Sequence, residues 1–423
     1  MNKVIEHLDL SSVDGSQLNL DALYRIAPSV FTEACDPKTG KVGRKEITSK
    51  GSLGIALNVK NSRFMEKVEA LYNKWKALQP LTEQKQYLFS QRFTVEYNYN
   101  SNHIEGNTLT YGQTELLLLF GKVSGEGELN DFVDMKASLV GMKMMQTESG
   151  THNPLTQNFI RQLHKTILRE DYTIYRNLPG GVQTSYTIHA GCYKTHPNSV
   201  ITRYGDCFEY ATPEETPALM TDLVDWYNES EQSGKYSPVE LAALFHYRYI
   251  RIHPFEDGNG RIARLMVNYI FSRHGWPMIV VRSRNKNEYI DALHQSDIEI
   301  GTSPSAGTHA TLAQIKHFLK YFKQLVAAEI QYAIDFASET SPNVWWYDGQ
   351  RVVFRSPSSS IILHTMQQYP DCTIEFIAQK AGIVEAAVKK QLAQMTKKGY
   401  IQRREKDGCW HVLAAASVLS SYK

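Results

Sequence analysis

The sequence predicts a mainly α-helical protein with one hairpin-like interruption and a small C-terminal domain. Apolar residues recur at helical spacing through most of the chain, as they do in residues 64–78. Prolines and glycines stand at the ends of these runs, where they start or stop helices. Residues 177–210 are instead rich in Gly, Pro, Thr, Tyr and Val, which is typical of turns and a short β-hairpin.

The composition narrows the class of protein. The chain has 423 residues, enough for two or three domains, and its net charge of +2 gives no general sign of binding to nucleic acid or membrane. Its 5 cysteines are scattered without a C-x-x-C pair, so neither a disulfide framework nor a zinc ribbon is indicated. We find no signal peptide and no apolar run of about 20 residues, so we expect a cytoplasmic protein that does not bind membranes.

Capping residues place the helices along the chain. Thr82 is an expected N-cap, the pair Thr212 and Glu215 signals another helix, and Pro238 starts an apolar helix that we expect to be central. Further helical runs lie at about 111–123, 130–148, 155–168, 286–298 and 311–338. We expect four regions: 1–60 of unknown role, a helical region at 61–150, a central domain at 151–340 and a small domain at 355–415.

The C-terminal region has its own pattern. Residues 339–360 are typical of a linker or a small strand pair at a domain boundary. Three short helical runs follow, and then an alternating stretch with a Lys-Asp-Gly turn that predicts a hairpin. This order is that of a winged helix-turn-helix domain.

The stretch "HPFEDGNGRIAR", residues 253–264, gathers the groups that handle a nucleoside triphosphate. The glycines around Asn259 begin a helix, where backbone N–H groups and the helix dipole favour an anion. Arg261 and Arg264 share one face of that helix and suit phosphate, while Asp257 could hold Mg²⁺. Each piece alone has a simpler explanation, such as a turn, a cap or a solvent-facing arginine. Their order within one short stretch makes those explanations improbable.

This stretch resembles the signature of the Fic family, H-x-F-x-(D/E)-G-N-G-R-x-x-R, and it matches every fixed position. The apolar helix before it is also similar to that family, and the likeness extends over roughly residues 80–300. The resemblance implies a Fic-type helical bundle that transfers AMP from ATP to a Tyr, Thr or Ser hydroxyl of a protein target, with Mg²⁺. Transfer of UMP, phosphate or phosphocholine remains open, because the signature recognises phosphates better than the rest of the donor.

The resemblance also assigns roles to residues of the stretch. His253 would be the general base, Phe255 would anchor the loop in the core, and Asp257 would bind Mg²⁺. The phosphates would be held by Gly258, Asn259, Gly260, Arg261 and Arg264. Glu256 falls on a variable position, and we expect it to be solvated. Tyr289 either lines the adenine pocket or is a core tyrosine.

A second motif, "SNHIEGN" at residues 101–107, lies upstream. On its own it is a helix end with Gly106 at the C-terminal position. It resembles the family's inhibitory motif (S/T)-x-x-x-E-(G/N) through Ser101, Glu105 and Gly106. The resemblance implies that Glu105 pairs with Arg264 and withholds the charge that the γ-phosphate needs. In some family members the same carboxylate supports removal of AMP, and the sequence does not separate the two directions.

Residues 190–201 lie where the family has a β-hairpin flap over the active site. The resemblance implies that Cys192, Tyr193, Lys194 and Thr195 help to dock the target by strand addition. On its residues alone, this segment is an ordinary surface hairpin. Such docking aligns a hydroxyl without identifying the partner.

The C-terminal region offers a different class of function. Lys389, Lys390, Lys397 and Lys398 on its third helix, and Arg403, Arg404 and Lys406 in the wing, could contact DNA phosphates. Winged helices also serve as protein-docking or dimer modules, and Glu385 is a poor reader of bases. The rival hypothesis is therefore a DNA-binding regulator with a nucleotide-sensing Fic domain. The sequence is also compatible with a homodimer.

Overall fold

The computed structural model describes residues 31–35, 42–46, 67–123, 127–177, 183–198, 200–201, 207–301, 303, 305–404 and 408–416. The chain divides into two compact units, residues 1–73 and 74–423. In the first unit, β1 (Phe31–Cys35) and β2 (Val42–Glu46) form an antiparallel pair. Most of region 1–60 lies outside the described residues.

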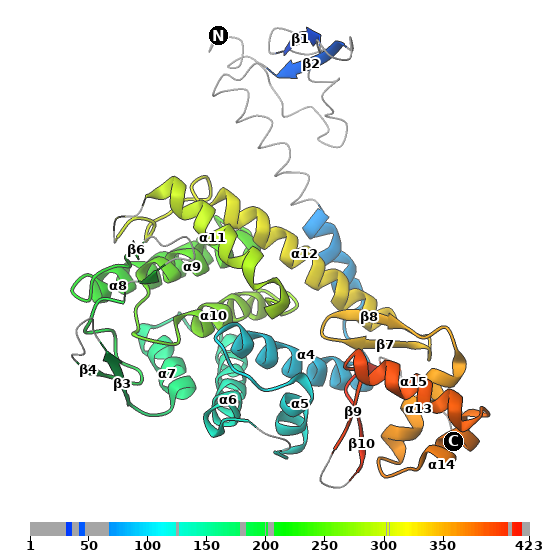
Figure 1. Ribbon diagram of the computed structural model, residues 1–423. Coiled ribbons are helices and arrows are strands. Elements are labelled where there is room, and N and C mark those ends of the chain that lie inside the picture. The colour runs from blue at the N-terminus through cyan, green and yellow to red at the C-terminus, as the bar shows by residue number, and fades with distance from the viewer. Residues whose placement is uncertain are drawn as a thin grey trace. The chain divides into compact units, whose positions relative to one another are not determined.

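Two helices form the centre of the second unit. α9 (Pro238–Ile252) and α10 (Asn259–Arg273) pack against each other, and most of their residues are buried (Figure 1). A helix that is apolar on nearly all sides belongs in a core. α9 begins as the sequence predicts, with Pro238 in its first turn and a capping box between Ser237 and Glu240.

The other helices of this unit surround that pair, and their positions follow the sequence closely. They are α4 (Glu83–Ile104), α5 (Tyr111–Phe120), α6 (Leu129–Thr151), α7 (Gln157–Leu168), α8 (Thr216–Ser233), α11 (Lys286–Ile300) and α12 (Lys316–Ser338), with the short 3₁₀ turn η4 (Ser283–Asn285). Thr82 caps α4 as expected, by accepting a hydrogen bond from the Lys85 backbone. α12 begins later than expected, because turns with i to i+3 hydrogen bonds occupy part of residues 305–315.

Two short strand pairs precede α8. β3 (Tyr172–Asn177) pairs with β4 (Gln183–Ile188), and β5 (Val200–Ile201) pairs with β6 (Cys207–Phe208). The prediction of a hairpin over residues 190–201 is therefore wrong in its bounds, since only 200–201 are strand among the residues described in that range. Residues 190–198 instead follow an irregular path that is fixed by hydrogen bonds to the loop between α9 and α10.

The C-terminal part forms a compact group beside α4 (Figure 1). Its elements are β7 (Val344–Tyr347), β8 (Gln350–Val353), α13 (Pro357–Gln368), α14 (Ile374–Ala381), α15 (Glu385–Lys397), β9 (Ile401–Arg403), β10 (Trp410–Val412) and β11 (Ala415–Ala416). Strands β11, β7 and β8 make one sheet, and β9 pairs with β10. Trp345, Ile362 and Val388 lie in a separate apolar core. Three helices followed by a strand pair is the order that the sequence predicts.

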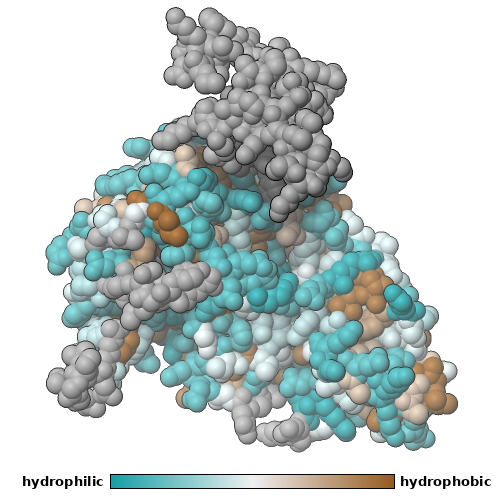
Figure 2. Space-filling view, turned by 45° about the horizontal axis from the view of Figure 1, so that its top comes forward, coloured by the Kyte–Doolittle hydropathy of each residue, from teal (hydrophilic) through white to brown (hydrophobic). Residues whose placement is uncertain are grey.

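The surface shows where apolar side chains remain exposed. Most of the face in Figure 2 is hydrophilic, with apolar patches towards the side where the C-terminal elements lie. Val353 and Val384 are among the exposed apolar residues of that part. Among the described residues, no helix is both long and apolar enough to cross a bilayer.

Candidate active site

A cavity of about 470 Å³ opens at the N-terminus of α10. Four elements meet there: the end of α4, the loop between α9 and α10, the start of α11, and the segment before α8. Its lining includes Glu105, His253, Asp257, Gly258, Asn259, Gly260, Arg264, Tyr210, Lys286 and Tyr289. The structure thus brings together most of the residues that the sequence predicts. Arg261 does not line this cavity.

The loop between α9 and α10 is tightly constrained. His253 ends α9 in a left-handed conformation, with φ 50° and ψ 61°, which is unusual for a residue with a side chain. Phe255 is fully buried, which confirms it as the anchor. Asn259 uses both polar side-chain atoms on the backbone of Phe255: its Oδ1 accepts from the Phe255 N–H at 3.0 Å and its Nδ2 donates to the Phe255 carbonyl. The Asn259 side chain therefore braces the loop and does not reach towards a phosphate.

The His253 side chain is arranged as a proton acceptor. Its Nδ1 lies 3.3 Å from the Ile250 carbonyl, which can only accept, so Nδ1 carries the hydrogen and Nε2 keeps a free lone pair. Burial, together with a smaller contribution from the nearby Lys194 charge, lowers the pKa of His253 to about 3. The Tyr210 ring stacks on the imidazole, with centroids 3.8 Å apart. His253 is thus neutral at neutral pH and held in one plane.

The start of α10 has the geometry of an anion site. Gly258 has φ 75°, and a side chain there would meet Leu168 Cδ1 at 2.9 Å. Glycine at this position therefore allows both the backbone conformation and the close packing. A helix N-terminus leaves N–H groups without an intrahelical partner, and together with the helix dipole these favour an anion at this end of the cavity. Arg264, one turn further on, is 3% exposed and adds a fixed positive charge.

Glu105 already binds this anion site. Its Oε1 lies 2.6 Å from Arg264 NH2, and a Cβ added to Gly260 would collide with the same oxygen. Ser101 supports the pair: its hydroxyl accepts from Arg264 Nε at 3.0 Å and its carbonyl accepts from NH2 at 2.8 Å. Burial disfavours the charged guanidinium, but the Glu105 carboxylate, together with Tyr289 and Tyr97, outweighs burial and raises the pKa of Arg264. Two residues of the motif at 101–106 therefore meet the second arginine of the 253–264 stretch, and Gly106 follows with φ 104°.

Asp257 is the carboxylate that could hold a metal ion. Its Oδ2 accepts from the Tyr172 hydroxyl at 2.7 Å and lies 3.3 Å from Arg261 NH2. Burial disfavours its charge, but Arg261 and the Tyr172 hydrogen bond outweigh burial, so the pKa of Asp257 lies below its ordinary value. No cluster of three metal-ligating side chains occurs in the described ranges. A single ionised carboxylate fits Mg²⁺ that also takes oxygens from nucleotide phosphates, since Mg²⁺ commonly binds one or two carboxylates plus phosphates.

Sequence reasoning missed the residues that support this loop from outside it. The Gly191 N–H donates to His164 Nδ1 at 2.8 Å, so Nε2 carries the proton and donates to the Asp257 carbonyl at 3.0 Å. The His164 ring also stacks on Phe255, with centroids 3.7 Å apart. Lys286 donates to the last carbonyl of α4, that of Ile104, at 2.6 Å. These residues come from distant segments, and nothing in the sequence places them beside the loop.

The segment expected to dock a target is only partly exposed. Lys194 is 3% exposed, and its Nζ donates to the Ile252 carbonyl, so this residue is not available for docking a target. Tyr193 is half-buried beside Phe255. Cys192 and Thr195 are exposed, and Thr195 donates to Glu256 Oε1 at 3.1 Å. The expectation that Glu256 is solvated is wrong, since its side chain is only 6% exposed.

The sequence leaves open whether Tyr289 is a core tyrosine or lines a pocket, and the structure shows that it does both. It is 3% exposed and its hydroxyl lies 2.9 Å from His246 Nε2, as in a core residue. Its ring nevertheless lines the cavity, next to Ile290 and Leu293. This wall is mostly apolar, which suits a nucleobase.

Comparisons with known proteins match this geometry. The model of the Fic/DOC family matches residues 154–271. A solved Fic domain containing signaling protein from Bacteroides thetaiotaomicron is 51% identical, with TM-score 0.60, over 65% of this chain and 98% of that one. Fic-1 from Caenorhabditis elegans shares the fold, at 24% identity and TM-score 0.51, over 69% of this chain and 77% of that one.

Curated relatives add an activity to this likeness. Protein adenylyltransferase fic-1 of Caenorhabditis briggsae is 29% identical over 287 residues, which are 67% of this chain and 49% of the relative. The C. elegans protein of the same name is 29% identical over 253 residues, 59% of this chain and 42% of that relative. The chain therefore spans about half the length, or less, of these relatives.

Proposed function

The chain belongs to the Fic/DOC family, and on that premise we propose that it transfers AMP from ATP to a hydroxyl group of a protein. The observation that carries the proposal is the neutral His253 beside the anion site of α10, in one cavity with Arg264. A base and a phosphate site that share one cavity suit nucleotidyl transfer. The curated relatives named protein adenylyltransferase support the donor.

In this reaction the target hydroxyl oxygen forms a bond to the α-phosphorus of ATP. His253 Nε2 takes the hydroxyl proton, and the bond to the β-phosphate oxygen breaks, so that pyrophosphate leaves. The N–H groups at Gly258 and Gly260 and the Arg264 guanidinium stabilise the phosphate charge, because they are fixed donors in a partly buried site. Mg²⁺, held by Asp257, would neutralise charge on the phosphates. Arg261 acts mainly by orienting Asp257.

The nucleoside and the target occupy different sides of the cavity. The adenine packs against Tyr289 and its apolar neighbours Ile290 and Leu293. The protein target would pair by strand addition with β5–β6, the strand pair that precedes α8. This replaces residues 192–195 as the docking segment, since Lys194 is buried.

Glu105 restrains the reaction by occupying part of the ATP site. Its carboxylate lies at the first turn of α10 and neutralises Arg264, so the outer phosphates lose one cation and meet a like charge. ATP then binds weakly or in a pose that misplaces the α-phosphate. Removal of Glu105 should release the enzyme.

One gel tests the proposal. Wild-type protein, Glu105→Gly, and Glu105→Gly combined with His253→Ala are incubated with Mg²⁺ and ATP labelled at the α-phosphate. We expect label on the Glu105→Gly protein alone. Label on the His253→Ala double variant would reject His253 as the base, and no label on any protein would favour another donor or removal of AMP.

A second candidate function is DNA binding by the C-terminal part, which would then be a winged helix. The exposed Lys389, Lys390, Lys397 and Lys398 on α15 favour it. Lys389 lies 3.6 Å from Glu385, however, so part of this charge is offset. A DNA complex that weakens steeply with salt would support this function, because phosphate contacts release counterions.

A further inference from the structure

Lys194 and Asn198 precede the β5–β6 pair in the chain. Both bind the backbone of the loop between α9 and α10. The Lys194 N–H donates to the Pro254 carbonyl at 2.9 Å and its Nζ donates to the Ile252 carbonyl at 3.0 Å. Asn198 Nδ2 donates to the carbonyls of His253 at 3.1 Å and Phe255 at 2.7 Å. Lys194 Nζ also donates to Asn198 Oδ1 at 2.9 Å. All four consecutive carbonyls from 252 to 255 are thereby bound by one pair of side chains and one backbone N–H.

We propose that Lys194 and Asn198 are positioning residues for the catalytic base, an inference that rests on the proposed function. His253 has a left-handed backbone that persists only when its surroundings fix it. The two residues fix the carbonyls on both sides of that conformation. Burial lowers the pKa of Lys194 to about 7, but both forms of the amine have N–H donors, so the contact survives loss of the charge.

The test uses Glu105→Gly protein as the parent, with Lys194→Met, Lys194→Arg or Asn198→Ala added. We expect Met and Ala to lower kcat by about tenfold or more through misplacement of the base, with ATP affinity close to the parent's. The Lys194→Arg variant keeps side-chain N–H donors and should therefore retain most of the parent's kcat. Amide exchange at His253 and Phe255 should be faster in the Lys194→Met and Asn198→Ala variants, and this readout needs no turnover.

Two outcomes would overturn the role of these residues. One is unchanged amide exchange at His253 and Phe255 in Lys194→Met. The other is a parallel fall of ATP affinity, Tm and kcat, which indicates general destabilisation. If the parent itself transfers no AMP, the proposed function fails, while amide exchange still decides whether the pair positions the loop.

A second set of contacts joins α4 to the C-terminal part. Arg92, Glu96 and Asn100 are spaced four residues apart and therefore share one face of this helix. Each bonds to the C-terminal part: Arg92 NH2 to the Leu413 carbonyl at 3.2 Å, Glu96 Oε1 to the Gly349 N–H at 3.1 Å, and Asn100 Nδ2 to Asp348 Oδ1 at 2.8 Å. Ser101, which follows Asn100, and Glu105, the C-cap of the helix, bond to Arg264.

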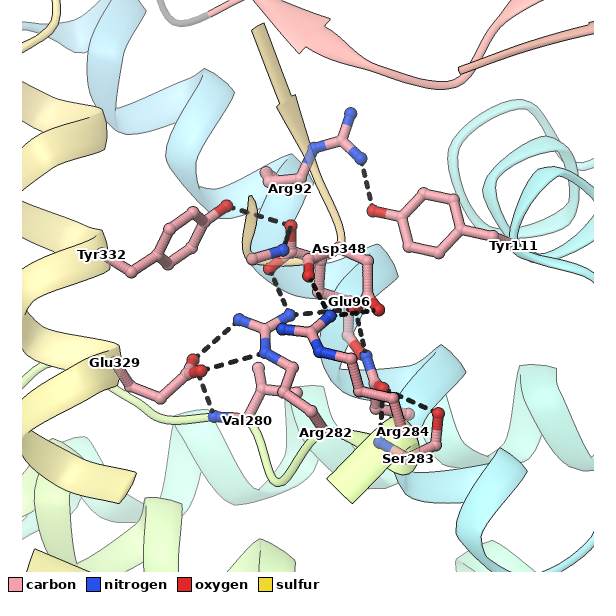
Figure 3. Close-up of polar contacts among 12 residues, drawn as sticks. Arg92, Glu96, Tyr111, Val280, Arg282, Ser283, Arg284, Glu329, Tyr332 and Asp348 are labelled. Atoms are coloured by element: carbon pink, nitrogen blue, oxygen red, sulfur yellow. Dashed lines mark hydrogen bonds and ion pairs between the residues drawn. The ribbon is translucent and has the colours of Figure 1, made fainter. Parts of the chain in front are cut away.

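The turn between β7 and β8 is the centre of these contacts (Figure 3). Asp348 and Gly349 have φ values of 43° and 70°, as in the tight turns that Asp-Gly favours. Arg282 lies against the turn and binds three carboxylates: Glu96 at 2.8 Å, Glu329 at 2.8 Å and Asp348 at 3.2 Å. Its side chain is 4% exposed. The turn therefore joins α4, α12 and the C-terminal part through one buried charge network.

We infer that this turn is a latch through which the C-terminal part holds the inhibitory end of α4 in place. The inference rests on the proposed inhibition by Glu105. A helix is rigid over one or two turns, so displacement of Glu96 and Asn100 also moves Ser101 and Glu105. Buried ion pairs contribute little net stability, but they can fix the position of one element relative to another. Such a contact can therefore hold α4 in place and still be released. A partner that pulls on the C-terminal part would then release the active site.

Gly349→Ala is the variant that opens the latch. An added Cβ would lie 2.6 Å from Arg282 Cζ and 2.7 Å from its NH2, and the left-handed backbone disfavours alanine. Gly382→Ala is the matched control, because Gly382 also has a left-handed φ, of 63°, lies in the same part and has nothing within 4 Å of an added Cβ. Asp348→Asn is a milder second variant, which removes the charge with little change of shape.

The readouts are amide exchange at residues 101–106, ATP affinity and auto-modification. We expect Gly349→Ala and Asp348→Asn to speed exchange there and to raise ATP affinity by about 5- to 150-fold, the range of allosteric couplings. Label from ATP should rise with Glu105 present and should not rise further in a Glu105→Gly background. A merely structural defect would lower activity instead.

The latch is rejected if exchange at 101–106 and ATP affinity in both variants match those of wild type and Gly382→Ala. These two readouts do not depend on AMP transfer. A failure of the proposed reaction would therefore appear as absent label with exchange still increased, and would be distinct from failure of the latch.

Discussion

The carboxylate of Glu105 lies 2.6 Å from the Arg264 guanidinium and fills the space above Gly260. Carboxylates and phosphates carry the same sign of charge and accept bonds from the same N–H donors. Glu105 therefore lies where the first turn of α10 would receive an outer phosphate. On the proposed function, the contact between α4 and α10 contains both the nucleotide site and its restraint.

Ser101→Ala should weaken that restraint only in part. The change removes the hydroxyl that accepts from Arg264 Nε, while the Ser101 carbonyl and Glu105 remain bound to NH2. A hydrogen bond to a charged group contributes about 1.5–3 kcal/mol, so we expect auto-modification between that of wild type and Glu105→Gly. The rate of label incorporation measures it. A rate below wild type would show that Ser101 supports catalysis and not inhibition.

The Tyr210 ring should contribute to kcat by stacking on His253. In the Glu105→Gly background, Tyr210→Leu removes the surface that stacks on His253, and we expect kcat to fall by about tenfold with ATP affinity retained. Tyr210→Phe keeps the stacking and is the matched control, expected close to the parent. Steady-state rates and calorimetric ATP titrations separate the two effects. Equal rates for the Leu and Phe variants would exclude the stacking as a determinant.

Tyr172 should set the metal requirement. Its hydroxyl donates to Asp257 and orients the carboxylate, and loss of such an outer partner typically costs 10–100-fold in metal affinity or activity. Tyr172→Phe in the Glu105→Gly background should therefore raise the Mg²⁺ concentration needed for half-maximal transfer by about tenfold. Asp257→Ala should abolish transfer at all Mg²⁺ concentrations. An unchanged Mg²⁺ requirement in Tyr172→Phe would contradict this role.

The sequence predicts the helices and the chemistry of the loop well, because both are encoded locally. Periodicity and caps place α4 and α9, and the 253–264 stretch carries its base, glycines and arginines in order. The supporting residues are different. Tyr172 and His164 reach Asp257 across long stretches of chain, and no local pattern marks such contacts. The burial of Lys194 was likewise unpredictable, since a lysine is normally exposed.

Three histidines with lowered pKa values should make the stability of the fold sensitive to acid. Burial lowers the pKa of His164 to about 4, and those of His246 and His253 to about 3, from an ordinary 6.5. The unfolded chain therefore takes up these protons first as the pH falls. Their contribution to stability is complete above pH 6.5 and is lost as the pH falls from there towards 4. The slope approaches about 1.4 kcal/mol per pH unit for each histidine.

Tm measured between pH 7 and pH 4 checks this predicted loss of stability in acid. His164→Gln keeps one donor and one acceptor for Asp257 and Gly191, and it should reduce the slope of Tm against pH by about one third. A slope identical to wild type would mean that His164 is already protonated in the folded protein or does not titrate in this range.

The most direct test of occupancy by Glu105 compares ATP with ADP. Both nucleotides, with Mg²⁺, are titrated by calorimetry into wild-type and Glu105→Gly protein that also carries His253→Ala to prevent turnover. If Glu105 takes the place of the outermost phosphate, its removal should strengthen ATP binding by about tenfold and ADP binding much less. An equal gain for both nucleotides, or none for ATP, would show that Glu105 does not compete with that phosphate.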